Sequence, residues 1–156
     1  MIQIIRVDDR LLHGQVAVSW KADLNYEAIV IASDSAANDK IRTAALKLAK
    51  PDGVLIAIRT IEDSIKLLNH EKLQNLRVFV VTDTIEGAQK IIQGVNEHPT
   101  LNIGGIQQDE GKNPVVSYAY LSEKDVIVLK ELDNEGVNIE FRLVPSDKAT
   151  KLKDVL

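Results

Sequence analysis

Five residues that could carry out chemistry lie within seven positions near the start of the chain. Asp8, Asp9, Arg10, His13 and Gly14 follow a short apolar run and precede a helical pattern. Histidine suits reversible phosphoryl transfer, because imidazole is partly neutral at physiological pH and its free nitrogen is then a nucleophile. The combination therefore predicts chemistry on an anion at His13.

The neighbouring residues would support a phosphoryl group in complementary ways. Arg10 offers a planar, permanently charged guanidinium that suits phosphate oxygens. Asp8 or Asp9 could accept a hydrogen bond from one imidazole nitrogen and fix the tautomer, which would leave the other nitrogen free to attack. Gly14, at the start of a helix, would allow a phosphate to come close to backbone amides that have no intrahelical partner.

Each of these residues also has an ordinary structural interpretation. A histidine after a strand is commonly a polar loop residue, and two aspartates at a strand end often cap a helix. Arg10 could be a solvated ion-pair partner of Asp8. Residue types and spacing alone leave both interpretations open.

Alternating strands and helices must position this motif. Short apolar runs alternate with helical periodicity, which predicts an α/β fold with an open, mainly parallel sheet, helices on both faces, and an antiparallel or edge strand near the C-terminus. The predicted strands are 2–7, 27–32, 54–58, 77–81 and 101–103, and the predicted helices are 14–22, 36–49, 60–69, 84–93 and 122–136.

Three of these segments rest on particular patterns. In the helix over 36–49, apolar residues recur close to the 3.6-residue period, with Lys47 in the last turn and Pro51 just beyond it. Residues 107–114 are predicted as a polar loop and 115–118 as a short edge strand. Apolar and polar residues alternate over 137–144, which indicates an edge strand exposed on one side. The periodic apolar residues of the helix are Ile41, Ala44, Ala45, Leu48 and Ala49.

More polar residues follow other predicted strands. Because the ends of parallel strands meet at one edge of a sheet, Gly104 and Gly105 should lie on the same rim as His13. They could form a tight turn or contact a phosphate. Asp34 and Asp83 also belong to that rim, where helix capping is the simpler role.

Composition excludes several classes of function. The 156 residues suffice for one domain over 1–156, and the net charge of −4 with interspersed signs argues against nucleic-acid binding. Without cysteine there can be no disulfide or thiolate metal site. His70 and His98 lie in polar segments, so we expect neither a metal nor a cofactor. No apolar run reaches the roughly 20 residues of a membrane helix, and no signal-peptide pattern is present, which predicts a cytoplasmic protein.

The first motif also resembles that of a known family. Residues Ile5–Val16, with Trp20 downstream, are similar to the signature of the IIB subunits of the mannose/fructose/sorbose class of the bacterial phosphotransferase system. The resemblance departs from the family pattern at Ser33, which could alter the rim around the site and with it sugar or partner preference, and at Ile106. It continues through the blocks 31–39, 50–54, 101–106 and 143–147.

This resemblance implies a phosphocarrier. His13 would be the phosphorylated nucleophile, Arg10 the phosphate clamp and Asp8 the residue that orients the imidazole, with Asp9, Gly14 and Gln15 in support. The donor would be a IIA protein or domain. The acceptor would be a sugar held by a IIC/IID membrane permease, at the inner face of the membrane. No metal is implied, and homo-oligomerisation stays open.

Two other classes of function could use parts of this motif. A receiver-like signalling module would use an acidic pair such as Asp8 and Asp9, but Arg59 and Thr60 stand where its phosphorylated Asp should follow the third strand. A nucleotide-binding α/β module needs a Gly-rich fingerprint after the first strand, where only Gly14 is present.

Overall fold

The computed structural model describes all 156 residues, Met1–Leu156. The strands are β1 (Ile2–Val7), β2 (Ala28–Ala32), β3 (Leu55–Arg59), β4 (Val78–Thr82), β5 (Thr100–Ile103), β6 (Lys112–Val116), β7 (Ala119–Ser122), β8 (Ile139–Phe141) and β9 (Thr150–Lys151). The α-helices are α1 (Gly14–Leu24), α2 (Asp34–Ala37), α3 (Lys40–Ala49), α4 (Ile61–Leu68), α5 (Ile85–Gly94) and α6 (Glu123–Asn134), and the 3-10 helices are η1 (Glu71–Leu73) and η2 (Leu152–Asp154).

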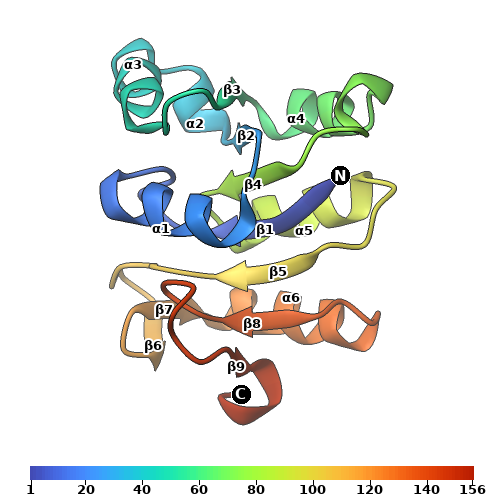
Figure 1. Ribbon diagram of the computed structural model, residues 1–156. Coiled ribbons are helices and arrows are strands. Elements are labelled where there is room, and N and C mark those ends of the chain that lie inside the picture. The colour runs from blue at the N-terminus through green and yellow to red at the C-terminus, as the bar shows by residue number, and fades with distance from the viewer.

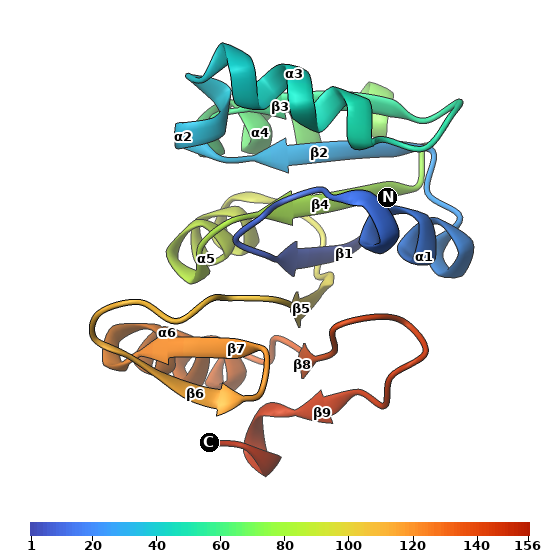
Figure 2. The ribbon, with the colours of Figure 1, turned by 90° about the vertical axis from the view of Figure 1, so that its left-hand side faces the viewer.

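Seven strands form one sheet in the order β3-β2-β4-β1-β5-β8-β9. All neighbours in it are parallel except β8 and β9, which are antiparallel. Helices α1 and α3 lie against one face, and α4, α5 and α6 cover the other (Figures 1 and 2). The predicted fold class, a mainly parallel sheet with helices on both faces and an antiparallel strand near the C-terminus, is confirmed.

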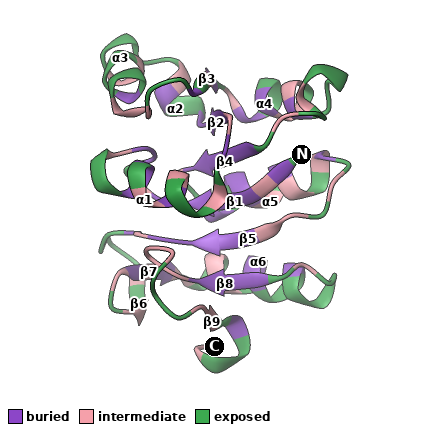
Figure 3. Cartoon of the chain, viewed as in Figure 1, coloured by how far each residue is buried: buried purple, intermediate pink, exposed green.

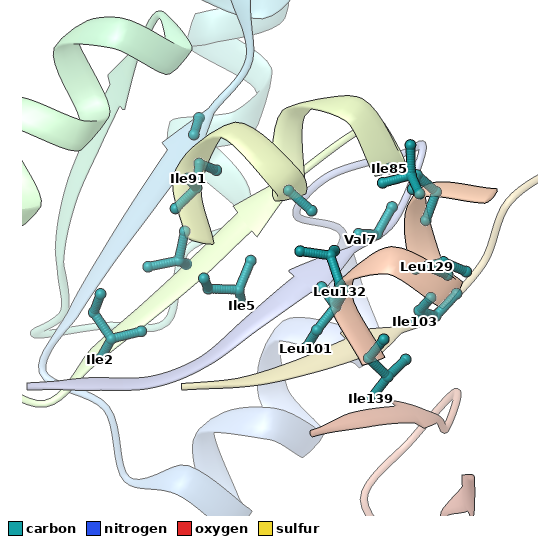
Figure 4. Close-up of a cluster of buried hydrophobic side chains, with 14 of the residues drawn as sticks. Ile2, Ile5, Val7, Ile85, Ile91, Leu101, Ile103, Leu129, Leu132 and Ile139 are labelled. Carbon is teal, nitrogen blue, oxygen red and sulfur yellow. The ribbon is translucent and has the colours of Figure 1, made fainter. Parts of the chain in front are cut away.

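Two apolar cores flank the sheet because each central strand buries side chains on both faces. Along β4, Val78 and Val80 belong to the core under α4, α5 and α6, whereas Phe79 and Val81 belong to the core under α1 and α3. This two-sided burial explains why the strands read as continuous apolar runs. Figure 4 shows the larger core, where side chains of β1 and β5 meet those of α5 and α6.

The connections of β1 and β5 leave the sheet in opposite directions. After β1 the chain passes through α1 to β2, toward the β3 edge, and after β5 it leads to β8, toward the β9 edge. Open α/β sheets bind ligands at such a divergence, beyond the carboxyl ends of the strands. The loop 8–13 and Gly104–Gly105 both lie at this point. None of the helices has the length and apolar composition that spanning a bilayer requires.

The helix predicted over 36–49 is wrong as one unit. It is broken at Asn38 and Asp39, and Asp39 caps a new helix by accepting hydrogen bonds from the amides of Ile41 and Arg42. Most of the periodic apolar residues of α3 also face solvent, whereas the periodicity predicted that they face the core. Leu46 is buried, whereas Ile41 and Leu48 are among the most exposed large apolar residues of the chain.

The segment between β5 and α6 also differs from its prediction. Residues 112–116, mostly placed in a polar loop, form β6, which pairs with β7 as an antiparallel hairpin outside the main sheet. Pro114 discourages a strand assignment from sequence, since it removes a backbone donor. The hairpin accommodates it beside an irregularity in register between Pro114 and Val116. At the start of α6, Ser122 and Asp125 form a reciprocal capping box.

The prediction of a half-exposed edge strand over 137–144 is wrong. The strand is shorter, and β8 is flanked by β5 on one side and by β9 on the other. Its central residue, Glu140, is polar yet only 8% exposed. Burial of this carboxylate is tolerated because it accepts hydrogen bonds from Asn102 Nδ2 at 2.9 Å and Arg142 Nε at 2.8 Å. Glu140 and Arg142, two of the polar residues of the alternation, therefore belong to a network with Asn102.

Candidate functional site

The site is built on the loop that joins β1 to α1. Its first two amides bind the neighbouring strand ends: Asp8 N donates to Thr82 O at 3.0 Å, and Asp9 N donates to Gly105 O at 2.9 Å. The loop is thus fixed to the segments that follow β4 and β5. The predicted position of Gly105 on the same rim is confirmed by this contact.

A tight turn then carries the chain back to His13. Leu11 N donates to Asp8 O at 2.9 Å, and Leu11 adopts a left-handed conformation with φ of 59°. This conformation is unfavourable for a branched side chain. Burial of Leu11 and Leu12 in the core under α1 offsets the strain and holds the loop rigid.

The turn brings His13 against Asp8. Nε2 of His13 lies 3.3 Å from Oδ2 of Asp8. Oδ1 of Asp8 accepts the amide of Arg10 at 3.1 Å. The Asp8 side chain is fully buried, whereas that of His13 is 25% exposed. One ring nitrogen therefore faces an internal carboxylate, and Nδ1 stays available for another partner.

Asp9 has a different contact. Its Oδ2 accepts the amide of Gln107 at 2.6 Å, and its carbonyl accepts Arg42 Nη2 at 3.4 Å. Asp9 thereby joins the β1–α1 loop to the segment after β5 and to α3. The structure separates the two aspartates: Asp8 contacts the imidazole, and Asp9 fixes the loop.

Sequence reasoning missed Arg6, the buried cation of the site. Its Nη2 lies 3.1 Å from Asp8 Oδ2, and its Nη1 donates to Asn102 Oδ1 at 2.7 Å. The two nitrogens also donate to the carbonyls of Arg142 and Leu143 at 3.1 and 2.9 Å. Burial lowers the pKa of Arg6, and the charge of Asp8 opposes that shift. A signal was available, since a charged residue inside an apolar strand run calls for a buried partner.

Two neighbours shape the space around Arg6. A Cβ atom on Gly104 would overlap the Arg6 guanidinium, so packing, rather than backbone conformation, explains this glycine. On another side, Arg6 lies 5.3 Å from the centre of the Trp20 ring, and Arg142 lies 5.2 Å from it. Trp20 is fully buried. It anchors the core between the two cations.

The amino end of α1 completes the site. His13 is its N-cap residue, but no side chain caps this helix, and its first turn has no acidic residue. Gly14 and Gln15 are exposed there, and nothing lies within 4 Å of a Cβ built on Gly14. Such amides carry partial positive charge and suit an anion. Arg10, in the same loop, is exposed as well.

The other rim residues form a separate cluster at the ends of β2 and β4. Ser33 is buried, and its Oγ accepts Ala36 N at 3.2 Å and donates to Asp83 Oδ2 at 2.8 Å. Asp34 Oδ1 accepts the first amide of α4, Ile61 N, at 2.8 Å. The expected N-cap role is wrong for both aspartates, because Ser33, Thr60 and Thr84 are the N-cap residues of α2, α4 and α5. Asp34 instead binds α4 from outside, and Asp83 binds Ser33 and Ser35. No hydrogen bond or ion pair joins this cluster to the His13 side chain, whose partner is Asp8.

The remaining histidines have ordinary surroundings. His70 is exposed, and its Nδ1 accepts Lys72 N at 3.1 Å, which caps η1. His98 is exposed as well. The structure contains no group of three or more His, Asp and Glu side chains arranged to hold a metal ion.

Comparison with known proteins extends the resemblance to the whole chain. The family described as PTS system sorbose subfamily IIB component matches residues 2–156. A probable phosphotransferase enzyme IIB component of Streptococcus pyogenes serotype M6 is 37% identical over 162 residues, which cover 100% of this chain and 99% of that protein. The mannose-specific EIIAB component of Escherichia coli K12 is 30% identical over 156 residues, all of this chain but 48% of that protein.

The folds agree as well. The crystal structure of the IIBSor domain of the sorbose permease from Klebsiella pneumoniae superimposes with a TM-score of 0.93 at 30% identity, covering 99% of this chain and 94% of that one. Family, length and fold thus coincide. The chain therefore belongs to the sorbose-subfamily IIB components of the phosphotransferase system, in the mannose/fructose/sorbose class, which act as phosphotransferases in sugar uptake.

Proposed function

We propose that residues 1–156 form a phosphohistidine carrier in which His13 accepts a phosphoryl group from a IIA partner and passes it to a sugar at a IIC/IID permease. The observation that carries this proposal is the contact between His13 Nε2 and the buried carboxylate of Asp8. That contact orients the imidazole beside the uncapped amino end of α1.

The same contact favours one ring nitrogen as the nucleophile. A carboxylate paired with Arg6 accepts hydrogen bonds. Nε2 of His13 therefore carries the ring proton and donates a hydrogen bond to Asp8 Oδ2. The lone pair of Nδ1 then attacks phosphorus, and the P–N bond of the donor breaks as the new P–N bond forms. In the second step, a sugar hydroxyl oxygen attacks phosphorus and loses its proton to solvent water, and the electrons of the P–N bond return to Nδ1.

Charge on the phosphoryl group would be offset by the exposed side of the loop. Arg10 can supply a two-pronged guanidinium, and Gly14 and Gln15 can supply amides at the start of α1. Arg6 is unsuited to this task because all its charge is directed into the protein, toward Asp8 and Asn102. Arg6 instead supports the reaction through Asp8. The chemistry is mainly positioning and electrostatic stabilisation, and the proposal includes no metal.

The partners follow from the family and from one relative. The mannose-specific EIIAB component of Escherichia coli joins, by its name, a IIA and a IIB part, and this chain matches about half of it. A IIA protein or domain is therefore the donor that we propose. A IIC/IID permease would receive the carrier at the inner face of the membrane and present the sugar, so the carrier would work in the cytoplasm.

Phosphorylation by a phosphorylated IIA donor, followed by mass spectrometry without acid, tests the proposal. We expect one phosphate on His13 in the wild type, on Nδ1 by nitrogen NMR, and none in His13→Ala. Arg10→Lys should slow the transfer without changing the unfolding free energy, because Arg10 is exposed. Phosphate on an aspartate would instead favour a receiver-like module, and no phosphate from a competent donor would refute the carrier.

A further inference from the structure

The outer surface of α3 carries an apolar stripe that the core does not use. Ile41 and Leu48 are 85% and 88% exposed, more than any other large apolar residue in the chain. Ala44 and Ala45 lie between them and are exposed too. Because these four residues follow the spacing i, i+3, i+4 and i+7, they form one stripe along the helix. Figure 3 shows that the outside of α3 is exposed.

Folding does not require this stripe. The opposite side of α3 attaches the helix to the protein, with Leu46 buried in the core under α1 and α3 and Ala49 packed against it. An exposed apolar pair of this size usually marks an interaction surface.

All charged residues of α3 itself are cationic. Residues 40–50 contain Lys40, Arg42, Lys47 and Lys50 and no acid, although the chain as a whole has a net charge of −4. Helical spacing places Lys40 and Lys47, seven residues apart and both exposed, along one border of the stripe. The nearest acid, Asp39, is occupied by the amides of the first turn of α3.

We propose that this face of α3 binds the surface of a membrane that contains anionic lipids. Aliphatic side chains on a basic helix face enter the boundary between headgroups and acyl chains, while lysines bind lipid phosphates. A protruding helix with cations only fits a broad anionic plane better than it fits a closed groove on a protein. The structure thus assigns to α3 a direct lipid contact, independent of any permease contact.

The position of α3 gives this contact a use, and this step rests on the proposed function. Arg42 Nη2 donates to Asp9 O at 3.4 Å, so the first turn of α3 touches the loop that carries His13. A protein held on the bilayer by α3 keeps His13 beside the membrane, where a permease-bound sugar would be reached. Lipid binding would also raise the local concentration of the carrier at the permease.

Sedimentation with vesicles tests the lipid contact without any phosphoryl transfer. The wild type should bind phosphatidylcholine vesicles that contain phosphatidylglycerol, bind pure phosphatidylcholine vesicles far less, and be released by high salt. The double variants Ile41→Ser/Leu48→Ser and Lys40→Glu/Lys47→Glu should each need at least about tenfold more lipid for half-binding. All four side chains are exposed or border solvent, so the variants should keep the wild-type melting temperature.

Matched controls lie on α6, which covers the other face of the sheet. Ile127 is 57% exposed, and Lys124 and Lys130 are exposed. Ile127→Ser and Lys124→Glu/Lys130→Glu should bind vesicles as the wild type does. The proposal is overturned if the wild type does not bind the anionic vesicles, or if the α3 variants bind them as well as the wild type does. One further pair of results would indicate that this face docks a protein instead. The wild type would then not bind lipid, and the IIA donor would phosphorylate the Ile41/Leu48 variant more weakly than the wild type. Phosphorylation of His13 in the wild type tests the proposed function separately, because that assay contains no lipid.

Discussion

Arg6 and His13 meet at a single atom, Oδ2 of Asp8, which lies 3.1 Å from the guanidinium and 3.3 Å from the imidazole. A fully buried cation therefore holds the carboxylate that orients the exposed nucleophile. A change in Arg6 can therefore affect His13 through that shared oxygen, although Arg6 itself is fully buried and makes no contact with the imidazole.

The first prediction concerns Arg6 as a positioning residue. Arg6→Met leaves Asp8 without its buried counterion and should lower the unfolding free energy by about 3–5 kcal/mol. Arg6→Lys keeps the charge, but an ammonium cannot replace the four hydrogen bonds, so a smaller loss is expected. Chemical denaturation measures both.

A second readout separates positioning from stability. In folded Arg6→Lys protein, nitrogen NMR should show a smaller fraction of His13 with the proton on Nε2, and transfer from phosphorylated IIA should slow by about tenfold or more. A folded variant with an unchanged tautomer and an unchanged rate would show that Arg6 serves the fold alone.

The second prediction compares the two adjacent aspartates. Asp8→Asn removes the acceptor charge shared by Arg6 and His13, and it should lower the transfer rate by about a hundredfold. Asp9→Asn removes only part of a loop contact with Gln107, so its unfolding free energy should fall by about 1 kcal/mol with a near-normal rate. Equal rates for the two variants would contradict the assignment of Asp8, and rapid-quench phosphorylation assays distinguish the cases.

The third prediction concerns two glycines of the site. A methyl group at Gly104 would displace the Arg6 guanidinium, so Gly104→Ala should cost about 1–3 kcal/mol and slow the transfer. Gly14→Ala meets no neighbour and begins a helix, so it should leave stability unchanged or raise it by up to about 1 kcal/mol. Urea unfolding of both variants checks this difference. A stable, fully active Gly104→Ala protein would show that the guanidinium can move freely.

The sequence was sufficient to predict where His13 lies in the fold. A strand, a polar turn and a helix within the first 24 residues are local patterns, and they place His13 at the carboxyl edge of the sheet. The order of strands is not local, so the proximity of Gly105 followed only from the expectation of parallel strands. Only one partner of Arg6, Asp8, is near it in the chain. The other three, Asn102, Arg142 and Leu143, are 96, 136 and 137 residues away, so its buried environment was not a local pattern.

The prediction of the buried face of α3 failed for a different reason. Apolar periodicity reports that a helix has an apolar face, but it does not say what covers that face. Ile41 and Leu48 are the largest of the periodic apolar residues in the segment, but in the folded protein Leu46 is the one that is buried. The alternation over 137–144 misled in the same way, since Glu140 is polar yet internal, paired with Arg142.

The last prediction concerns alkaline pH and Tyr26. Burial raises the pKa of Tyr26 to about 12, and its hydroxyl donates to Ala17 O at 2.8 Å. The folded protein thus keeps this proton at a pH where the unfolded chain, with a pKa of 10.0, loses it. The protonated group contributes its full stability below pH 10, and that contribution declines as the pH rises from about 10 to about 12.

Tyr26→Phe should therefore be less stable than the wild type at pH 8, since it lacks the hydrogen bond, and the difference should shrink through that alkaline range. Tyr120→Phe serves as the control for general alkaline unfolding. Urea titrations at a series of pH values measure the difference, and a gap between wild type and Tyr26→Phe that stays constant from pH 8 to pH 12 would refute the linkage.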